Sequence, residues 1–358
     1  MQAFTYESAG GRVVFANGAF SRVPDEIDLL GASRVLLVAD RSGRRWADEL
    51  AANLGWRLAA RIDDVRVHVP LEDAEAARRM ARDSSADVVV TIGGGSATGL
   101  AKAVALELGL AIVAVPTTYA GSEATPIWGL TADSRKETGR DARVQPRVVV
   151  YDPVLTVSLP VSISAASGMN ALAHCIEAMY ATGANPITTV IAEQGVRLLW
   201  DGLPRVVGQP DDLDARGDVL VAAYLAGSAF GTAGAGIHHK ICHVLGGAYD
   251  LPHADTHSAV LPHSLAFVTP ALPEVVERLA RTVGSEPAGR VHDFAAAIGA
   301  PLSLRAIGMA EADLDEAASL VAAAVGPHPR SASVAEIRSL LADAFDGVRP
   351  VAPAAAPV

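Results

Sequence analysis

Short aliphatic runs alternate with helical segments over the first 155 residues, and this alternation constrains the fold more than any other feature of the sequence. Runs that read as strands lie at 34–40, 65–69, 87–92, 110–115 and 147–151, and helices are expected at 72–82 and 97–108. Strands that are apolar along their whole length are buried on both faces, as in a parallel sheet between two layers of helices. The alternation therefore predicts an α/β domain with a parallel sheet.

The pattern differs on either side of this series. Two short strands are expected before it, at 4–7 and 12–15, joined at Gly10-Gly11. After Pro160 the strand patterns end, and helices are expected at 165–182, 186–203, 213–232 and 273–283. A capping box, Ser333-Val-Ala-Glu336, opens a last helix that ends at Gly347. We expect an α/β domain over 1–155, an all-helical domain over 156–348 and a disordered Pro/Ala-rich tail over 349–358.

The composition of the chain excludes several classes of protein. The 358 residues carry a net charge of −11, which argues against general nucleic-acid binding. Cys175 and Cys242 are the two cysteines, and they do not have the spacing of a disulfide framework or a thiolate zinc site. The N-terminal residues lack a signal-peptide pattern, and no run approaches the roughly 18 apolar residues of a membrane helix. We expect a cytoplasmic protein without a membrane partner.

A glycine-rich turn follows the run at 87–92, where a strand gives way to a helix. It consists of Gly93, Gly94, Gly95 and Ser96. Glycines let the backbone approach a pyrophosphate, and the N-terminus of the next helix offers unpaired N–H groups and a positive dipole. A plain tight turn uses the same residues, but the position after a buried strand favours phosphate binding.

Three further side chains are expected at the same edge of the sheet. Asp40 ends the run at 34–40, where a carboxylate can bind the 2′-hydroxyl of an NAD ribose or can simply end the strand. Thr117 and Thr118 follow the run at 110–115. Their hydroxyls either line a nucleotide pocket or cap the local turn.

Five of the ten histidines lie between residues 236 and 257. Within this stretch His239 and His243 are four residues apart, which places them on one face of a helix, and His253 and His257 follow after Gly246-Gly247. Separately satisfied histidines are the alternative interpretation. The density of imidazoles, which serve as ligands and proton shuttles, favours a functional site, and His243 and His257 are candidate proton donors.

A second pair of polar residues belongs to the same hypothesis. Asn170 and His174 are four apart on the helix expected at 165–182, and with His239 and His253 they form a four-point polar set. A carboxylate at position 170 would complete a divalent metal site with three imidazoles, but a neutral amide is a poor ligand for a transition metal. We therefore expect no tightly bound metal at these four positions.

These motifs together resemble the iron-containing alcohol dehydrogenase superfamily. The resemblance covers nearly the whole chain and rests on Gly93-Gly-Gly-Ser, Pro116-Thr-Thr, Gly168-Met-Asn-Ala-Leu-Ala-His and the spacing of His239, His243 and Pro252-His253. It implies an N-terminal dinucleotide-binding domain and an all-helical C-terminal domain, as in dehydroquinate synthase. Metal-dependent members have Asp where this chain has Asn170.

Three segments look similar to maleylacetate reductases, one branch of that superfamily. They are Thr117-Thr-Tyr-Ala-Gly-Ser-Glu-Ala-Thr-Pro-Ile-Trp-Gly-Leu-Thr131, residues 139–153 and His238-His-Lys-Ile-Cys-His243. This resemblance implies reduction of maleylacetate, a small unsaturated oxo-dicarboxylic acid, to 3-oxoadipate during degradation of aromatic compounds, with NADH or NADPH and without a metal. It also suggests Lys240 and Arg140 as cations for the substrate carboxylates. We expect a homodimer.

Three other functions stay open at this point. A metal-dependent alcohol or hydroxy-acid dehydrogenase of the same fold would need a ligand set that Asn170 weakens. A catalytically silent nucleotide-binding protein would be expected to lack several of the site histidines, which this chain has. A lyase similar to dehydroquinate synthase would need more basic residues and a full set of metal ligands.

Overall fold

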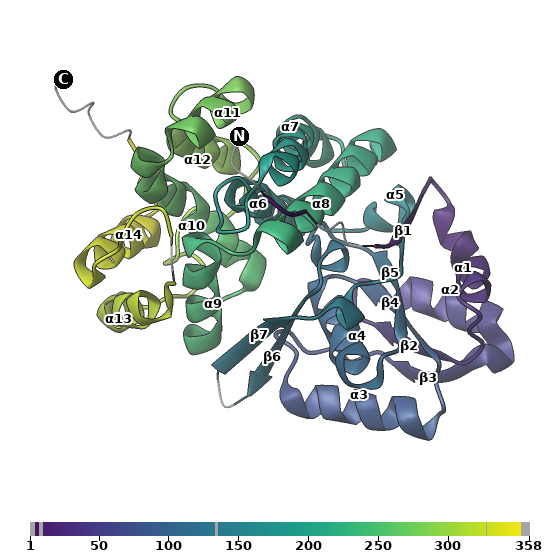
Figure 1. Cartoon of the computed structure of the whole chain (residues 1–358). Coiled ribbons are helices and arrows are strands. Elements are labelled where there is room, and N and C mark those ends of the chain that lie inside the picture. The colour runs from purple at the N-terminus through teal and green to yellow at the C-terminus, as the bar shows by residue number, and fades with distance from the viewer. Residues whose placement is uncertain (1–3, 7–9, 133–134, 327, 352–358) are drawn as a thin grey trace.

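The computed structural model describes residues 4–6, 10–132, 135–326 and 328–351, which form two lobes (Figure 1). The first lobe contains a six-stranded parallel sheet in the order β1-β8-β5-β4-β2-β3. Its strands are β1 (Arg12–Phe15), β2 (Val35–Ala39), β3 (Leu58–Ile62), β4 (Val88–Gly93), β5 (Ala111–Pro116) and β8 (Val148–Tyr151). The expected parallel α/β domain is confirmed.

Helices cover both faces of this sheet, which explains its continuous aliphatic strands. Alternate residues of β2 belong to two different apolar clusters: Leu36 and Val38 face one, and Val35 and Leu37 face the other. The covering helices are α1 (Val23–Leu29), α2 (Arg44–Leu54), α3 (Leu71–Asp83) and α4 (Gly95–Leu108). Because the central strands β2, β4, β5 and β8 are buried on both sides, a polar alternation in them would leave unpaired groups inside the domain.

Several expected strands were wrong. Residues 65–69 form a turn in which His68 and Val69 have φ values of 63° and 49°, and the third parallel strand is β3 at Leu58–Ile62. Edge strand β3 is half-buried and carries Arg61, which hides its aliphatic pattern. Residues 4–6 are not a strand, residue 7 lies outside the described residues, and β1 pairs in parallel with β8 instead of forming a hairpin. An antiparallel hairpin, β6 (Ile127–Ala132) with β7 (Arg135–Arg140), was not anticipated.

The second lobe is helical, as expected, and α6 runs through its middle. Every residue of α6 from Ser164 to Ala178 is buried, and α7, α8 and α10 pack around it. The helices are α5 (Pro153–Thr156), α6 (Val161–Ala178), α7 (Pro186–Gly208), α8 (Leu213–Ala233), α9 (Ile237–Tyr249), α10 (His253–Val268), α11 (Pro273–Val283), α12 (Pro287–Ala297), α13 (Leu314–Ala324) and α14 (Val334–Asp346). The capping box of Ser333 and Glu336 at α14 is present.

The helical lobe contains the longest helices of the chain and its C-terminal segment. Among the described residues no single helix is long and apolar enough to cross a membrane; α8 and α9 together meet that test but are bent by 99° at their junction. Of the tail, residues 352–358 lie outside the described residues, whereas Arg349 forms a two-bond ion pair with Asp293 at 2.8 and 2.9 Å.

Candidate active site

Three helices bring the predicted polar residues together. Buried helix α6 carries Asn170 and His174 one turn apart, α9 carries His239 and His243, and α10 carries His253 and His257. The chain turns at Leu251-Pro252, and α10 begins directly at His253. Helices α6 and α9 both pack against α10. Imidazoles that are far apart in the sequence therefore meet between the three helices.

The ring distances show one continuous cluster. The His239 ring lies 4.8 Å from that of His174 and 4.6 Å from that of His257, and the His257 ring lies 4.5 Å from that of His253. His243 is at the margin, 6.0 Å from His239 and 6.5 Å from His253 between ring centroids. The structure thus unites all five predicted histidines.

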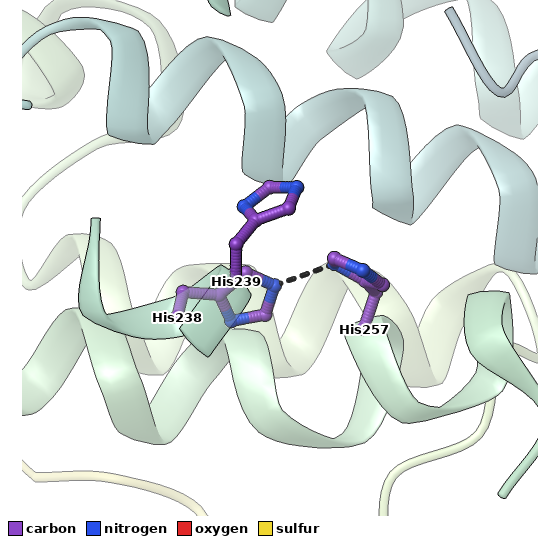
Figure 2. A group of neighbouring side chains, drawn as sticks. All are labelled: His238, His239 and His257. Carbon is purple, nitrogen blue, oxygen red and sulfur yellow. Dashed lines mark hydrogen bonds between the residues drawn. The ribbon is translucent and has the colours of Figure 1, made fainter. Parts of the chain in front are cut away.

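A sixth histidine, His238, was missed by the sequence hypothesis. Its Nε2 lies 2.8 Å from Nδ1 of His257, and its Nδ1 lies 3.0 Å from Oγ of Ser264. Figure 2 shows these two rings facing each other, while the His239 ring leaves α9 in a different direction. His238 precedes His239 directly, which was the available signal, but neighbouring residues on a helix point about 100° apart. Its role behind His257 is visible only in three dimensions.

Burial favours the uncharged form of three of these imidazoles. It lowers the pKa of His238 to about 3 and holds the pKa values of His174 and His257 well below their usual range, with the neighbouring histidines acting in the same direction at His174 and His257. Glu177 opposes this lowering at His174 and His238. A neutral imidazole donates one hydrogen bond and accepts another. The cluster can therefore offer both N–H donors and lone pairs to a polar ligand.

Glu177 is the other residue that the sequence hypothesis missed. Its side chain is fully buried on α6, and one carboxylate oxygen contacts Nδ1 of His239. The available signal was its position three residues after His174, on the same side of α6. A single glutamate in an apolar helix does not reveal its partner, because that partner lies 62 residues away.

The glycine-rich turn joins β4 to α4, as expected. Helix α4 begins at Gly95, no side chain caps its first turn, and Gly95 itself is exposed. A side chain on Gly94 would lie 3.0 Å from the Thr118 methyl group, and one on Gly93 would lie 2.4 Å from Asp40 Oδ2. The uncapped amides at Gly95 and Ser96 are therefore the open part of this turn.

Asp40 is engaged in building the turn. Its Oδ2 accepts a hydrogen bond from the Gly94 amide at 2.7 Å, and its Oδ1 accepts from the amide and hydroxyl of Ser42 at 2.9 and 2.6 Å. The Ser42 hydroxyl lies 2.7 Å from that of Thr117. Asp40 and Thr117 thus hold the ends of β2, β4 and β5 together at the carboxyl edge of the sheet, where ligands bind in such folds.

The turn and the histidine cluster approach each other through the segment after β5. The amide of Tyr119, which follows Thr118, donates to Oγ of Ser167 at 3.4 Å. Ser167 lies on α6 three residues before Asn170. A ligand that extends from the glycine-rich turn past Thr118 would therefore reach the cluster of imidazoles.

Comparison with known proteins is consistent with this geometry. A family model described as iron-containing alcohol dehydrogenase matches residues 10–153, and one described as Fe-containing alcohol dehydrogenase family, C-terminal, matches residues 164–345. The chain belongs to the iron-containing alcohol dehydrogenase family. Members of this family are NAD(P)H-dependent oxidoreductases.

Within the family, several of the similar proteins are maleylacetate reductases. The chain is 46% identical to the maleylacetate reductase of Sphingobium indicum over 97% of this chain and 99% of that one. It is 45% identical to that of Burkholderia cepacia over 98% and 100%. The crystal structure of maleylacetate reductase from Agrobacterium tumefaciens superimposes with a TM-score of 0.93 at 44% identity, covering 98% and 100% of the two chains.

The family name implies a metal. The ring nitrogens of His238, His239 and His257 lie within 4.8 Å of one another, but the predicted set of Asn170, His174, His239 and His253 fits a metal poorly. Asn170 supplies an amide in place of a carboxylate, and its Oδ1 is buried without a hydrogen-bond partner among the described residues. The His174 and His239 rings are stacked, with planes 14° apart. Ligand lone pairs lie in the ring plane, so stacked rings do not converge on one ion as tetrahedral ligands do. We derive no chemical step through a metal.

The residues fit a nicotinamide dinucleotide better. The first amides of α4 lack a side-chain cap, and Gly95 leaves open space in front of them, with no atom nearer than 3.7 Å to where a Cβ would be. Such amides bind phosphate oxygens through hydrogen bonds and the helix dipole. The carboxylate of Asp40 lies beside Gly94, where a carboxylate can accept a hydrogen bond from a ribose hydroxyl.

Proposed function

We propose that this chain is a maleylacetate reductase, which reduces the conjugated double bond of maleylacetate to give 3-oxoadipate with NADH or NADPH in the degradation of aromatic compounds. The observation that carries the proposal is the near-complete coverage by maleylacetate reductases that are 45–46% identical. The cluster of imidazoles beside Asn170 supports it, because it offers donors to a carbonyl oxygen without a metal.

The chemistry follows from the polarity of the substrate. A bound nicotinamide supplies a hydride to one alkene carbon. The electron pair of the double bond moves toward the conjugated carbonyl, and negative charge develops on that oxygen. Hydrogen-bond donors aimed at the oxygen stabilise the charge in the transition state. We assign this role to His174, His257 and the amide of Asn170, with His239 lying between His174 and His257 as a further residue of the site.

The enolate that results must gain a proton at carbon. His243 and His253 lie at the margin of the cluster and are half-buried, so both can exchange protons with solvent between turnovers. Imidazole is the side chain best suited to general acid catalysis near neutral pH. We assign the proton donation to one of these two residues.

The cofactor is assigned to the first lobe. Gly93, Gly94, Gly95 and Ser96 would hold its pyrophosphate, Asp40 its ribose, and Thr117 and Thr118 would line its path to the cluster. The uncapped start of α4 and the contact of Tyr119 with α6 support this placement.

The two cations suggested for the substrate carboxylates differ in position. Lys240 is half-buried on α9, next to His239 but about 100° around the helix. Arg140 is exposed on β7 and its guanidinium donates to the carbonyl of Gly231 on α8. Lys240 is therefore the stronger of the two candidates.

A homodimer in the cytoplasm is part of the same proposal. Edge strand β1 exposes Val13 and Phe15, which are 41% and 43% exposed, and its outer edge has no neighbouring strand in the described sheet. Pairing of two such edges buries apolar surface and satisfies the open backbone groups.

The decisive experiment follows nicotinamide oxidation by the purified protein with maleylacetate, with and without a chelator. We expect turnover at the same rate in both. Absence of turnover in both conditions would refute the substrate. Turnover that the chelator abolishes, and that added Fe²⁺ or Zn²⁺ restores, would refute the metal-free reaction.

A further inference from the structure

The carboxylate of Glu177 lies behind the histidine cluster and receives several hydrogen bonds at once. One of its oxygens contacts Nδ1 of His239, and the other accepts from the backbone amide of His239 and from the Tyr180 hydroxyl, each at 3.3 Å. The side chain is completely buried. Its hydrogen-bonding groups are therefore directed at protein partners.

These bonds tie α6 to the start of α9. Helix α9 begins after Gly236 without a side-chain cap of its own, and Glu177 receives the amide of its third residue, His239. A side chain on Gly236 would lie 2.6 Å from the carboxylate oxygen, so glycine permits this approach. A carboxylate at a helix N-terminus is also stabilised by the helix dipole.

The donors that face the Glu177 carboxylate determine which ring nitrogen of His239 carries the hydrogen. Burial raises the pKa of the Glu177 carboxyl, and His238 and the amides of Gly236, His239 and His238 act in the opposite direction. Amide and hydroxyl groups only donate to it, which favours the ionised carboxylate. An ionised carboxylate accepts from a ring nitrogen only if that nitrogen carries the hydrogen.

We propose that Glu177 is a positioning residue of the active site, which holds His239 with its hydrogen on Nδ1 and with Nε2 on the side of the ring away from Glu177. The kinetic part of this inference rests on the proposed reductase function. A carboxylate that fixes the tautomer of a functional imidazole has this role in other enzymes.

A purely structural role, as the cap of α9, is the alternative. Glu177→Gln separates the two. The amide oxygen of Gln still accepts from the first turn of α9, whereas its NH₂ group cannot accept from Nδ1–H of His239. The variant therefore keeps the cap and removes the acceptor that fixes the tautomer.

The first test needs no substrate. Long-range ¹H–¹⁵N spectra of histidine-labelled protein, with His239 assigned from the His239→Gln variant, report which ring nitrogen is protonated. We expect Nδ1–H in the wild type and Nε2–H in Glu177→Gln. A wild-type spectrum with Nδ1 unprotonated overturns the proposal whether or not the protein reduces maleylacetate.

The second test uses the wild-type reaction once it is observed. In Glu177→Gln we expect kcat to fall about 10- to 100-fold while the dissociation constant of the dinucleotide stays within about twofold. Glu177→Asp, which keeps the acceptor, is expected to regain part of the loss. A kcat equal to that of the wild type in Glu177→Gln overturns the proposal.

A matched control distinguishes loss of a buried charge from loss of positioning. Glu26 is equally buried, in the first lobe, and pairs with Arg12 at 2.7 Å. Glu26→Gln is expected to lower the melting temperature but to leave kcat of the folded protein unchanged. If Glu177→Gln behaves in the same way, Glu177 is only a structural residue and the proposal is wrong.

Discussion

The imidazoles of this site differ in how deeply they are buried, and this difference decides which of them can transfer protons. His174, His239 and His257 are nearly or fully buried, whereas His243 and His253 lie at the margin, half-buried. A group that must regain a proton in each turnover needs a path to solvent, but a group that only donates a hydrogen bond does not. The marginal pair is therefore the place to test proton transfer.

His243→Ala and His253→Ala test this assignment residue by residue. The substitution at the true donor is expected to lower kcat by about 10²- to 10⁴-fold, because general acid catalysis contributes that much. Dinucleotide affinity, measured by fluorescence titration, should remain near that of the wild type in both. As a control, His292→Ala changes a histidine on α12 whose Nε2 lies 3.2 Å from the carbonyl oxygen of Gly347. Near wild-type kcat in both test variants would refute the donor role.

The sequence revealed site residues that repeat with a helical period. Asn170 with His174 and His239 with His243 are each four apart, and that spacing predicted their shared faces, whereas the helix that carries His253 and His257 was not predicted. Neither His238 nor Glu177 belongs to one of these predicted pairs, although Cys242, four residues after His238, has its Sγ 3.7 Å from the His238 Nε2. Their roles depend on Ser264 and His257 on α10 and on the contact of α6 with α9, which only tertiary packing creates.

At the scale of elements, the start of α4 is the feature that the cofactor proposal depends on. Gly95→Ala should fold normally, since the new methyl group lies 3.7 Å from Ala120. The methyl group would nevertheless occupy space in front of the uncapped amides, where a phosphate must approach closely. We expect about tenfold weaker dinucleotide binding by titration, which is about 1.4 kcal/mol. Gly208→Ala, at the end of α7 with open space around it, is the control. Equal affinity in both variants would contradict the phosphate site.

A buried lysine connects α4 to the loop after β5. Lys102 donates to the carbonyl oxygens of Ser122, Thr125 and Ile127 at 2.6, 2.7 and 2.8 Å. Burial lowers the pKa of its ammonium to about 7, and Glu123 opposes that shift. The Lys102 ammonium thus provides hydrogen bonds to three carbonyl groups that point toward the interior of the protein.

Lys102→Met removes a donor from all three carbonyl groups, of which that of Ser122 still accepts from the amide and hydroxyl of Thr125. We expect the free energy of unfolding, measured in urea, to fall by about 1 to 3 kcal/mol for the unpaired buried groups. Arg79→Met removes an exposed cation from α3 and should change it by less than about 0.5 kcal/mol. A Lys102→Met protein as stable as the wild type would show that the loop does not depend on the hydrogen bonds from Lys102.

The elements that the sequence predicted best are strands with both faces buried and one helix, α11, with a single strongly apolar face. Strands β2, β4, β5 and β8 and helix α11 lie close to their expected positions, because uninterrupted aliphatic runs and a strong helical period have few alternatives. Strand β3 and the β6–β7 hairpin are half-buried or exposed and carry Arg61, Glu137 and Arg140. Their pairing depends on neighbours in the sheet more than on local pattern.

Across the whole molecule, the buried histidines link catalysis to stability. The folded state keeps His174, His238 and His257 uncharged, whereas the unfolded chain protonates them near the ordinary histidine pKa of 6.5. Below that pH the unfolded state binds more protons than the folded state, so the free energy of unfolding falls as the pH falls. Glu123 and Glu177, whose pKa values burial raises, act in the opposite direction.

His238→Phe isolates one part of this dependence. With a folded pKa of about 3 against the ordinary histidine pKa of 6.5, His238 should cost roughly 2 kcal/mol of stability between pH 8 and pH 5. Phenylalanine cannot titrate, so the loss over this range should be smaller in the variant by that amount. The quantity compared is the change in the free energy of unfolding from pH 8 to pH 5 in each protein. The loss of the bond to His257 lowers stability at both pH values and therefore cancels. The carboxyl groups titrate in both proteins, so their contribution cancels as well. Urea unfolding at pH 8 and pH 5 measures it, and equal losses in the two proteins would mean that His238 is protonated in the folded state.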